Sequence, residues 1–173
     1  MPKLIKLHGD SPANYHADWS NNAYVTVLDE DAIPASGAVI LPLVRFQAEG
    51  AALLDEGRSV GVLLQPDEAV EDLAYDLPRL ALVALAFPKY RDGRAYSSAR
   101  LLRDRYGFDG EIRAVGDVLR EVGGHMIRCG FDAFEPADDS TPQEWLAVAH
   151  RYHHIYQRGA DARQPAYVER GRA

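Results

Sequence analysis

The chain has 173 residues, enough for one domain with a single core, and its 47% hydrophobic and 26% charged content is ordinary for a globular protein. The formal net charge of −7 argues against general nucleic-acid binding, and no apolar run is long enough to cross a membrane. The single cysteine excludes an internal disulfide, and the N-terminus lacks the apolar core of a signal peptide, so we expect a cytoplasmic protein.

The first 37 residues form the least regular part of the chain. The runs KLIKL (3–7) and AYVTVL (23–28) predict one or two strands, the second by its β-branched content. Residues 9–22 between them are rich in Gly, Pro, Asn and Asp and indicate a loop. We expect Trp19, in this loop, to be a packing anchor; the alternative is a surface tryptophan that docks a partner.

From residue 38 onward, apolar runs alternate with helical patterns. The predicted strands span 38–43, 59–65, 80–87, 111–116 and 131–135. The predicted helices span 45–58, 68–77, 96–106, 117–130 and 142–157. This alternation predicts an α/β fold with a mainly parallel sheet built from about five βα units.

Two architectures fit this alternation. We favour an open, doubly wound sheet with helices on both faces, because the chain is short for a closed eight-stranded barrel. The alternative is the open part of a (βα) barrel. In either case residues 1–158 form one α/β domain, and residues 159–173 are predicted to be a mobile tail with little to bury.

Three details of the last two predicted helices bear on packing. Thr141 and Glu144 form a capping box that starts the final helix. Gly123-Gly124 stands in the middle of the helix 117–130, where it either breaks the helix or allows another element to approach closely. Cys129 falls on the apolar face of that helix, so we expect a buried and slowly reacting thiol.

Ligands of parallel α/β proteins bind at the carboxyl ends of the strands, which predicts the place of a site. The charged loop KYRDGR (89–94) follows the third predicted βα strand and leads into a helix that starts near Ser97 and Ser98. Guanidinium groups, hydroxyls and free N–H groups suit an oxyanion such as phosphate, sulfate or sulfite. The predicted anion-binding residues are therefore Lys89, Arg91, Arg94, Ser97 and Ser98. The alternative is that the arginines of this loop pair with neighbouring acids.

Other polar residues complete the candidate site, some at the same predicted edge and one, His125, at the margin of the apolar stripe of its helix. Asp117 is the candidate general base, although it also suits a helix N-cap. The predicted supporting residues are Arg45, Gln65, Arg113, Glu135 and His125. Arg113 has Glu111 on the same face of its strand, which favours a structural ion pair over catalysis.

Charge is distributed unevenly along the chain. Residues 87–113 hold seven cations and four acids, a net charge of +3, whereas the remainder of the chain has −10. A basic segment in an acidic protein predicts either a localised anion site or a docking face. For Arg100, Arg103 and Arg105 the alternative is a solvated helix face of alternating charge.

No motif for a cofactor is present in the sequence. There is no Walker A sequence, no G-x-G-x-x-G, no C-x-x-C and no H-E-x-x-H, so we expect no cofactor. His150, His153 and His154 have a spacing that can chelate a metal on a helix, but they lie opposite the apolar stripe and are expected to face solvent. We therefore predict no metal site.

The strings FPKYRDGRAYSSARLLRDRYGFDGEIRAVGDVL and RCGFDAFE, within residues 87–135, resemble the DUF934 family of bacterial proteins. Weaker resemblance extends over roughly residues 38–157. One departure is Val122-Gly123-Gly124-His125, where the family usually has bulky apolar residues. The family is associated with assimilatory sulfite reduction and often carries the label of a probable oxidoreductase.

This resemblance implies a pathway rather than a reaction. Our first hypothesis is an accessory or partner protein of sulfite reduction, with sulfite reductase as the partner and the basic loop as its docking or oxyanion-binding element. The second hypothesis is a small-molecule enzyme or binder for a substrate with a phosphate or sulfur oxyanion. The third is a purely structural subunit.

Overall fold

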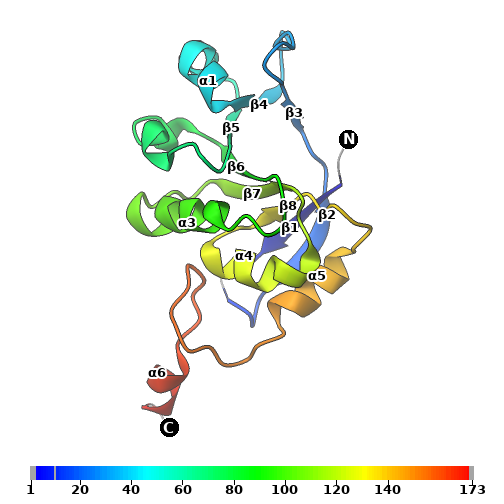
Figure 1. Ribbon diagram of the computed structural model, residues 1–173, viewed down its shortest axis with the longest axis vertical. Helices are drawn as coiled ribbons and strands as arrows, with labels where there is room; N and C mark the ends of the chain where they lie inside the picture. Colours follow the sequence, from blue (N-terminus) through cyan, green and yellow to red (C-terminus); the bar gives the residue numbers. More distant parts are fainter. Residues whose placement is uncertain (1–2, 10, 172–173) are drawn as a thin grey trace.

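The computed structural model describes residues 3–9 and 11–171 and shows one α/β sheet (Figure 1). The strands of this part are β1 (Leu4–His8), β2 (His16–Ser20), β3 (Tyr24–Thr26), β4 (Ala38–Pro42), β5 (Val60–Leu64), β6 (Leu82–Phe87), β7 (Glu111–Gly116) and β8 (Ala133–Phe134). The α-helices are α1 (Leu43–Arg45), α2 (Ala51–Asp55), α3 (Arg94–Arg100), α4 (Gly123–Cys129), α5 (Pro142–Ala149) and α6 (Ala166–Arg170). Turns of π-helix at Phe46–Gly50 and Leu101–Arg105 join α1 to α2 and extend α3, and 3₁₀ turns lie at Val70–Leu73, Leu77–Arg79 and Arg120–Val122.

The strand order decides between the two predicted architectures. It runs β2-β1-β8-β7-β6-β5-β4-β3, so β3 to β8 follow one another in a single direction and are parallel. A doubly wound sheet requires this order to reverse. The favoured doubly wound arrangement is therefore wrong. The mainly parallel sheet is confirmed, and its architecture is the alternative, an open part of a barrel.

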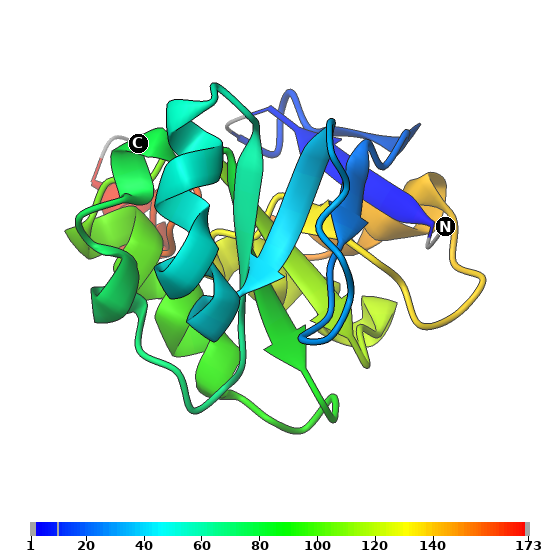
Figure 2. The same ribbon diagram turned by 90° about the horizontal axis from the view of Figure 1, so that it is seen from above.

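Right-handed crossovers that always step in the same direction place their helices on one face, as Figures 1 and 2 show.

The sheet curls because its two edge strands are consecutive in the chain. β2 and β3 stand at opposite edges, yet only residues 21–23 join them. Four Cα steps span at most about 15 Å, whereas seven strand spacings in a flat sheet would separate the edges by about 34 Å. The link therefore holds the sheet in a half-barrel whose convex face carries the helices. The doubly wound sheet was favoured because the chain is short for a closed barrel. That criterion was wrong, since short strands and this link allow a short chain to form a curled half-barrel.

The βα units are less regular than the sequence indicated. The four connections between β4 and β8 include only three with α-helix, and the predicted helix 68–77 is replaced by 3₁₀ turns. Val70, Leu73 and Leu77 are buried as predicted, but spacings of three and four residues also suit successive tight turns, and Pro78 prevents a longer helix. The detail of five βα units is not confirmed.

Two antiparallel strands at one edge differ from the expected parallel pattern. β1 pairs antiparallel with β8 and with β2, and the residues of β2 were predicted to be a loop. The polar sequence of β2 lacks the apolar pattern that predicts a strand, because Ala17 is the one residue of β2 that is buried in the core. The prediction for Trp19 is wrong, since this side chain is 49% exposed at the edge of the sheet.

The C-terminal helix is shorter than predicted. The capping box of Thr141 and Glu144 is confirmed, but α5 ends at Ala149 instead of near residue 157. His153 and His154 therefore lie beyond the helix, and the spacing that would place them with His150 on one helical face has no structural basis. His150 instead contacts the carbonyl oxygen of Pro12 through Nε2, at 2.6 Å.

The main core lies between the convex face of the sheet and the helices. Phe87, Phe131 and Trp145 are among its largest buried side chains. A second, smaller cluster of Ile40, Leu82 and Ala84 covers part of the concave face. None of the helices in the described part has the length and apolar character needed to cross a bilayer.

Arg113 is the centre of a buried polar network on the concave face. Its guanidinium donates to Glu111 at 2.6 Å, to Glu135 at 3.1 Å and to the Asn22 side chain at 3.0 Å. Lys6 reaches the other oxygen of Glu111 at 2.5 Å, so two cations face two carboxylates. The predicted structural ion pair of Arg113 and Glu111 is confirmed, and Asn22 ties the link between β2 and β3 to the sheet.

The segment after residue 158 contacts the domain at several points. The Ala160 N–H donates to the Arg128 carbonyl at 2.8 Å, and the Ala166 N–H donates to the Ile155 carbonyl at 2.7 Å. His154 pairs with Glu169 at 2.8 Å. That residues 159–173 contribute little to folding stays a prediction.

Candidate functional site

The predicted basic loop after β6 uses much of its charge locally. The Arg94 guanidinium donates two hydrogen bonds to Asp92, at 3.0 and 2.6 Å, and this pairing raises the Arg94 pKa and lowers that of Asp92. Arg91 donates to the Tyr90 hydroxyl at 2.7 Å and lies 5.3 Å from the centre of that ring. Lys89 is exposed. Of these three predicted anion-binding residues, Arg94 has its fork filled by an acid.

The other predicted edge residues have separate structural contacts. Asp117 is not an N-cap, because α4 begins only at Gly123, and its carboxylate accepts the N–H of Tyr90 at 2.9 Å. Arg45 donates to Glu49 and to the carbonyls of Leu28 and Asp31, which fixes the loop after β3.

Three more of the predicted residues are placed apart from that loop. Gln65 is exposed, whereas Arg113 and Glu135 belong to the buried network on the concave face. These residues therefore do not gather at one cavity with the loop after β6.

The basic segment is also divided among several environments. Arg103 is held by the carbonyls of Phe108, Gly110 and Gly130 and by Asp132, so it ties the α3 helix to the ends of β7 and β8. Arg105 lies 3.6 Å from Glu71. Arg100 pairs with Asp104 one turn further along the helix. Arg103 lines a hollow with Tyr15, Asp132 and Asp161, whereas Arg100 lines a separate cavity that contains a histidine and a cysteine.

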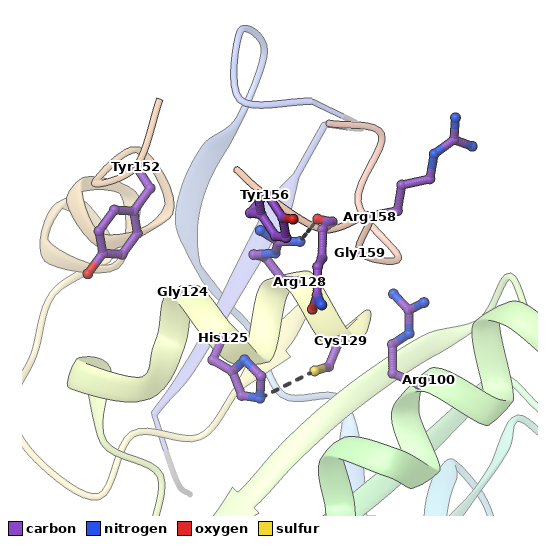
Figure 3. A pocket seen from close by; sticks show the side chains of 10 residues that line it. Arg100, Gly124, His125, Arg128, Cys129, Tyr152, Tyr156, Arg158 and Gly159 are labelled. Carbon is purple, nitrogen blue, oxygen red and sulfur yellow. Dashed lines mark hydrogen bonds between the residues drawn. The ribbon is translucent and has the colours of Figure 1, made fainter. Parts of the chain in front are cut away.

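That cavity is a groove of about 670 Å³ on the outer side of the helices, which we name the α3–α4 groove. It is bounded by Arg100 of α3, by one face of α4 and by the segment from Tyr152 to Gly159 (Figure 3). A second hollow of about 520 Å³ continues it along α3 and includes Tyr96 and Ser97. Of the residues predicted for the site, His125 and Ser97 lie here.

His125 and Cys129 form the centre of the groove. They are one helical turn apart on α4, and the Cys129 sulfur lies 3.7 Å from His125 Nε2. The ring of Tyr96 packs edge-on against the imidazole, with centroids 4.6 Å apart. Figure 3 shows Arg100 on the neighbouring helix beside Cys129, with its guanidinium group directed past the pair. Two helices therefore bring an imidazole, a thiol, a phenol and a guanidinium together.

Burial keeps the titratable groups of this centre neutral. It lowers the pKa of His125 below 6.5, and the nearby Arg128 lowers it further. Burial raises the pKa of the Cys129 thiol, which Arg100 and Arg128 only partly oppose. The pKa of Tyr96 is raised mainly by burial. At neutral pH the centre thus presents a neutral imidazole and a protonated thiol, which favours binding over nucleophilic attack.

The charge around this neutral centre is positive. Arg100, Arg128 and Arg158 line the larger hollow, whose lining contains no acid, and Asp104 is the acid that lines the smaller one. Arg128 donates to the Gln157 carbonyl, which fixes its direction. No ion pair of Arg158 is found within residues 3–9 and 11–171. Tyr152 and Tyr156 add exposed aromatic surface at the rim. The groove suits a ligand with an anionic group and an apolar part.

The thiol of Cys129 should react slowly in the folded protein. Only 7% of the residue is exposed and its pKa is raised by burial, so little thiolate is available to an alkylating reagent. Labelling with iodoacetamide at neutral pH should be far slower in buffer than in urea. Equal rates under the two conditions would contradict both the burial and the protonated thiol.

Sequence reasoning missed most of the groove for identifiable reasons. Arg100 was recognised as part of a basic segment, but nothing in the sequence indicates that it faces α4. The sequence assigns Cys129 to the core face of its helix and His125 to the margin of that face, so it does not indicate that the two side chains meet in one groove. Arg158 lies in a segment whose position depends on tertiary contacts.

Comparison with known proteins agrees with the resemblance in the sequence. Residues 61–167 match the family model described as "Bacterial protein of unknown function (DUF934)", and this range includes α3, α4 and the segment that bounds the groove. A search of the curated proteins found no match. Because the match covers more than half of the chain, the protein belongs to the DUF934 family.

Proposed function

We propose that this protein binds a small anionic ligand in the α3–α4 groove and acts as an accessory or partner protein of assimilatory sulfite reduction in the cytoplasm. The observation that carries the binding proposal is the lining of the larger hollow, which combines Arg100, Arg128 and Arg158 with a neutral imidazole and thiol; of the three arginines, Arg100 is paired with an acid, Asp104 at the margin of the hollow. Charge-assisted hydrogen bonds from guanidinium groups are the usual means of holding sulfur and phosphorus oxyanions. The pathway comes from the family resemblance, and sulfite reductase is the proposed partner.

A second candidate position for the anion is the predicted loop after β6. Arg91 is free of an acidic partner within the described residues, and Lys89 is exposed beside it. In that case Ser97 and Ser98 would contribute to anion binding and Asp117 would be the candidate general base, as in the sequence prediction. The two positions use different arginines, so mutation separates them.

Calorimetric titration with sulfate, sulfite and phosphate tests the binding proposal. Replacing Arg100 by Gln together with Arg158→Ala should weaken anion binding by about tenfold or more, because a hydrogen bond to a charged group contributes about 1.5–3 kcal/mol. Arg105→Ala is the matched control, since Arg105 follows Arg100 in the same helical segment but does not line the groove. It should bind as the unchanged protein does.

The double variant Arg91→Ala/Arg94→Ala distinguishes the two positions. Retained binding in this variant with loss in the Arg100/Arg158 variant supports the groove, and the reverse pattern moves the site to the loop. Absence of binding for every anion rejects both. Co-purification with sulfite reductase over a range of salt concentrations tests the partner role, which is rejected if the two proteins never associate.

A further inference from the structure

His8, His16 and Asp18 lie together on the β1–β2 hairpin, away from the groove. Their candidate ligand atoms all lie within 4.8 Å of one another. His8 and His16 are directly opposite in the antiparallel register, and their rings stack with centroids 4.9 Å apart. Asp18 is two residues further along β2, so its side chain is on the same face. Two paired strands thus present two imidazoles and a carboxylate side by side.

The hairpin that carries these side chains is anchored to the core. Leu7 and Ala17 are opposite each other in the register, point to the helical side and are buried. His8, His16 and Asp18 alternate with them and are exposed. The backbone that spaces the three polar side chains is therefore fixed, and the side chains themselves are exposed. His16 Nδ1 contacts the Asn14 carbonyl oxygen at 3.4 Å, which leaves Nε2 for a ligand.

The carboxylate of Asp18 is not paired with the lysine opposite it on β1. Lys6 is the direct partner of Asp18 in the register, but its ammonium group pairs with Glu111 on β7 at 2.5 Å. Within residues 3–9 and 11–171, no ion pair of Asp18 is found. A negative charge thus remains beside two imidazoles, which suits a cation better than it suits an anion.

We propose that His8, His16 and Asp18 bind a divalent transition-metal ion, for which zinc is the probe. Two imidazole nitrogens and one carboxylate oxygen are typical of zinc and related ions, whereas calcium and magnesium prefer oxygen ligands alone. Bonds of about 2.0–2.1 Å in tetrahedral geometry place ligand atoms about 3.3 Å apart. Rotation of exposed side chains closes the present spacing to that value. Three protein ligands leave one coordination position for water or an external ligand.

The sequence did not predict this site because the residues of β2 were interpreted as a loop. The motif H-A-D at 16–18 has the period of a strand, but His8 becomes its neighbour only through the antiparallel register. The sequence expectation of no metal site rested on the other histidines, at 150, 153 and 154. Those residues provide a matched control.

Titration of tag-free, metal-free protein with zinc tests the proposal. Calorimetry should show saturable uptake of one ion per chain, and zinc should raise the melting temperature because it binds the folded state. Each of His8→Ala, His16→Ala and Asp18→Asn should weaken zinc binding by at least about tenfold. Because the three side chains are exposed, the melting temperatures of these variants without zinc should equal that of the unchanged protein.

The controls are His153→Ala/His154→Ala and Cys129→Ser, which should bind zinc as the unchanged protein does. Loss of zinc binding in either control, with binding retained in His8→Ala, assigns the ion to another site and overturns the proposal. Absence of saturable uptake by the unchanged protein also overturns it. Selective loss in the three hairpin variants supports it.

Discussion

Replacing Arg113 by methionine should lower the free energy of unfolding by about 3 to 5 kcal/mol, because it leaves the largely buried Glu135 without its cation and Glu111 with Lys6 alone. The Arg113 side chain is 1% exposed, and Glu111 and Glu135 beside it are 12% and 16% exposed. Methionine fills a similar volume, so the loss reports the missing charge and hydrogen bonds rather than a cavity. Urea denaturation measures it. Arg105→Ala, at an exposed position, should change stability by no more than about 0.5 kcal/mol.

The pH dependence of the Arg113 variant gives an independent readout. Burial already raises the pKa of Glu135 above 4.5, and Arg113 opposes that rise. Without Arg113 this pKa should rise further, so the folded variant holds a proton that the unfolded chain releases. Stability should therefore decline as pH increases from 4.5 through the folded-state pKa. Glu135→Gln in the same background should remove much of this decline. A pH profile parallel to that of the unchanged protein would show that Glu135 is not left uncompensated.

The parallel part of the fold was predictable because each strand has a local signal. The runs that became β4 to β8 are apolar and end at proline or glycine signals, and burial on both faces of the sheet produces that pattern. The curl was not predictable in the same way. It depends on the pairing of β1 with β8, which is between residues far apart in the chain, and on the short link between β2 and β3.

The candidate site was predicted less well than the fold. The expectation that ligands bind at the carboxyl ends of strands directed attention to Arg91, Arg94 and Asp117, and their roles as ligand contacts stay a prediction. The groove arises where α3 faces α4, and no local feature of the sequence indicates that these two helices meet. His125 was nevertheless identified, because its place at the margin of the apolar stripe indicates a side chain close to both the core and the surface.

The double glycine shows how a local anomaly in the sequence reports a tertiary contact. Gly123 and Gly124 are in the first turn of α4 rather than in the middle of a helix. The backbone of Gly123 has φ −54° and ψ −41°, which any residue adopts, so glycine is not required for the conformation. Glycine is required at position 123 because a side chain there would not fit. A Cβ at Gly123 would lie 2.7 Å from the Trp145 ring, and the predicted close approach is confirmed for α5.

Gly123→Ala should therefore destabilise the protein by about 1 to 3 kcal/mol, the usual range for overpacking a core. Trp145 has little freedom to move away, because it is 1% exposed, stacks on Phe134 at 4.3 Å and donates to the Ser140 hydroxyl at 2.9 Å. Urea denaturation of the variant measures the loss.

The neighbouring glycine gives a matched control for this prediction. A Cβ at Gly124 would lie 3.4 Å from the Val148 carbonyl, close to ordinary contact. Gly124→Ala gains up to about 1 kcal/mol of helix propensity and should leave stability equal to that of the unchanged protein or higher. Gly123→Ala gains the same propensity, so the difference between the two variants isolates the steric term.

In a Trp145→Leu background, where the ring is absent, Gly123→Ala should become as harmless as Gly124→Ala, a coupling of about 1 kcal/mol or more. If the two alanine variants have the same stability in both backgrounds, Trp145 does not explain why glycine stands at position 123.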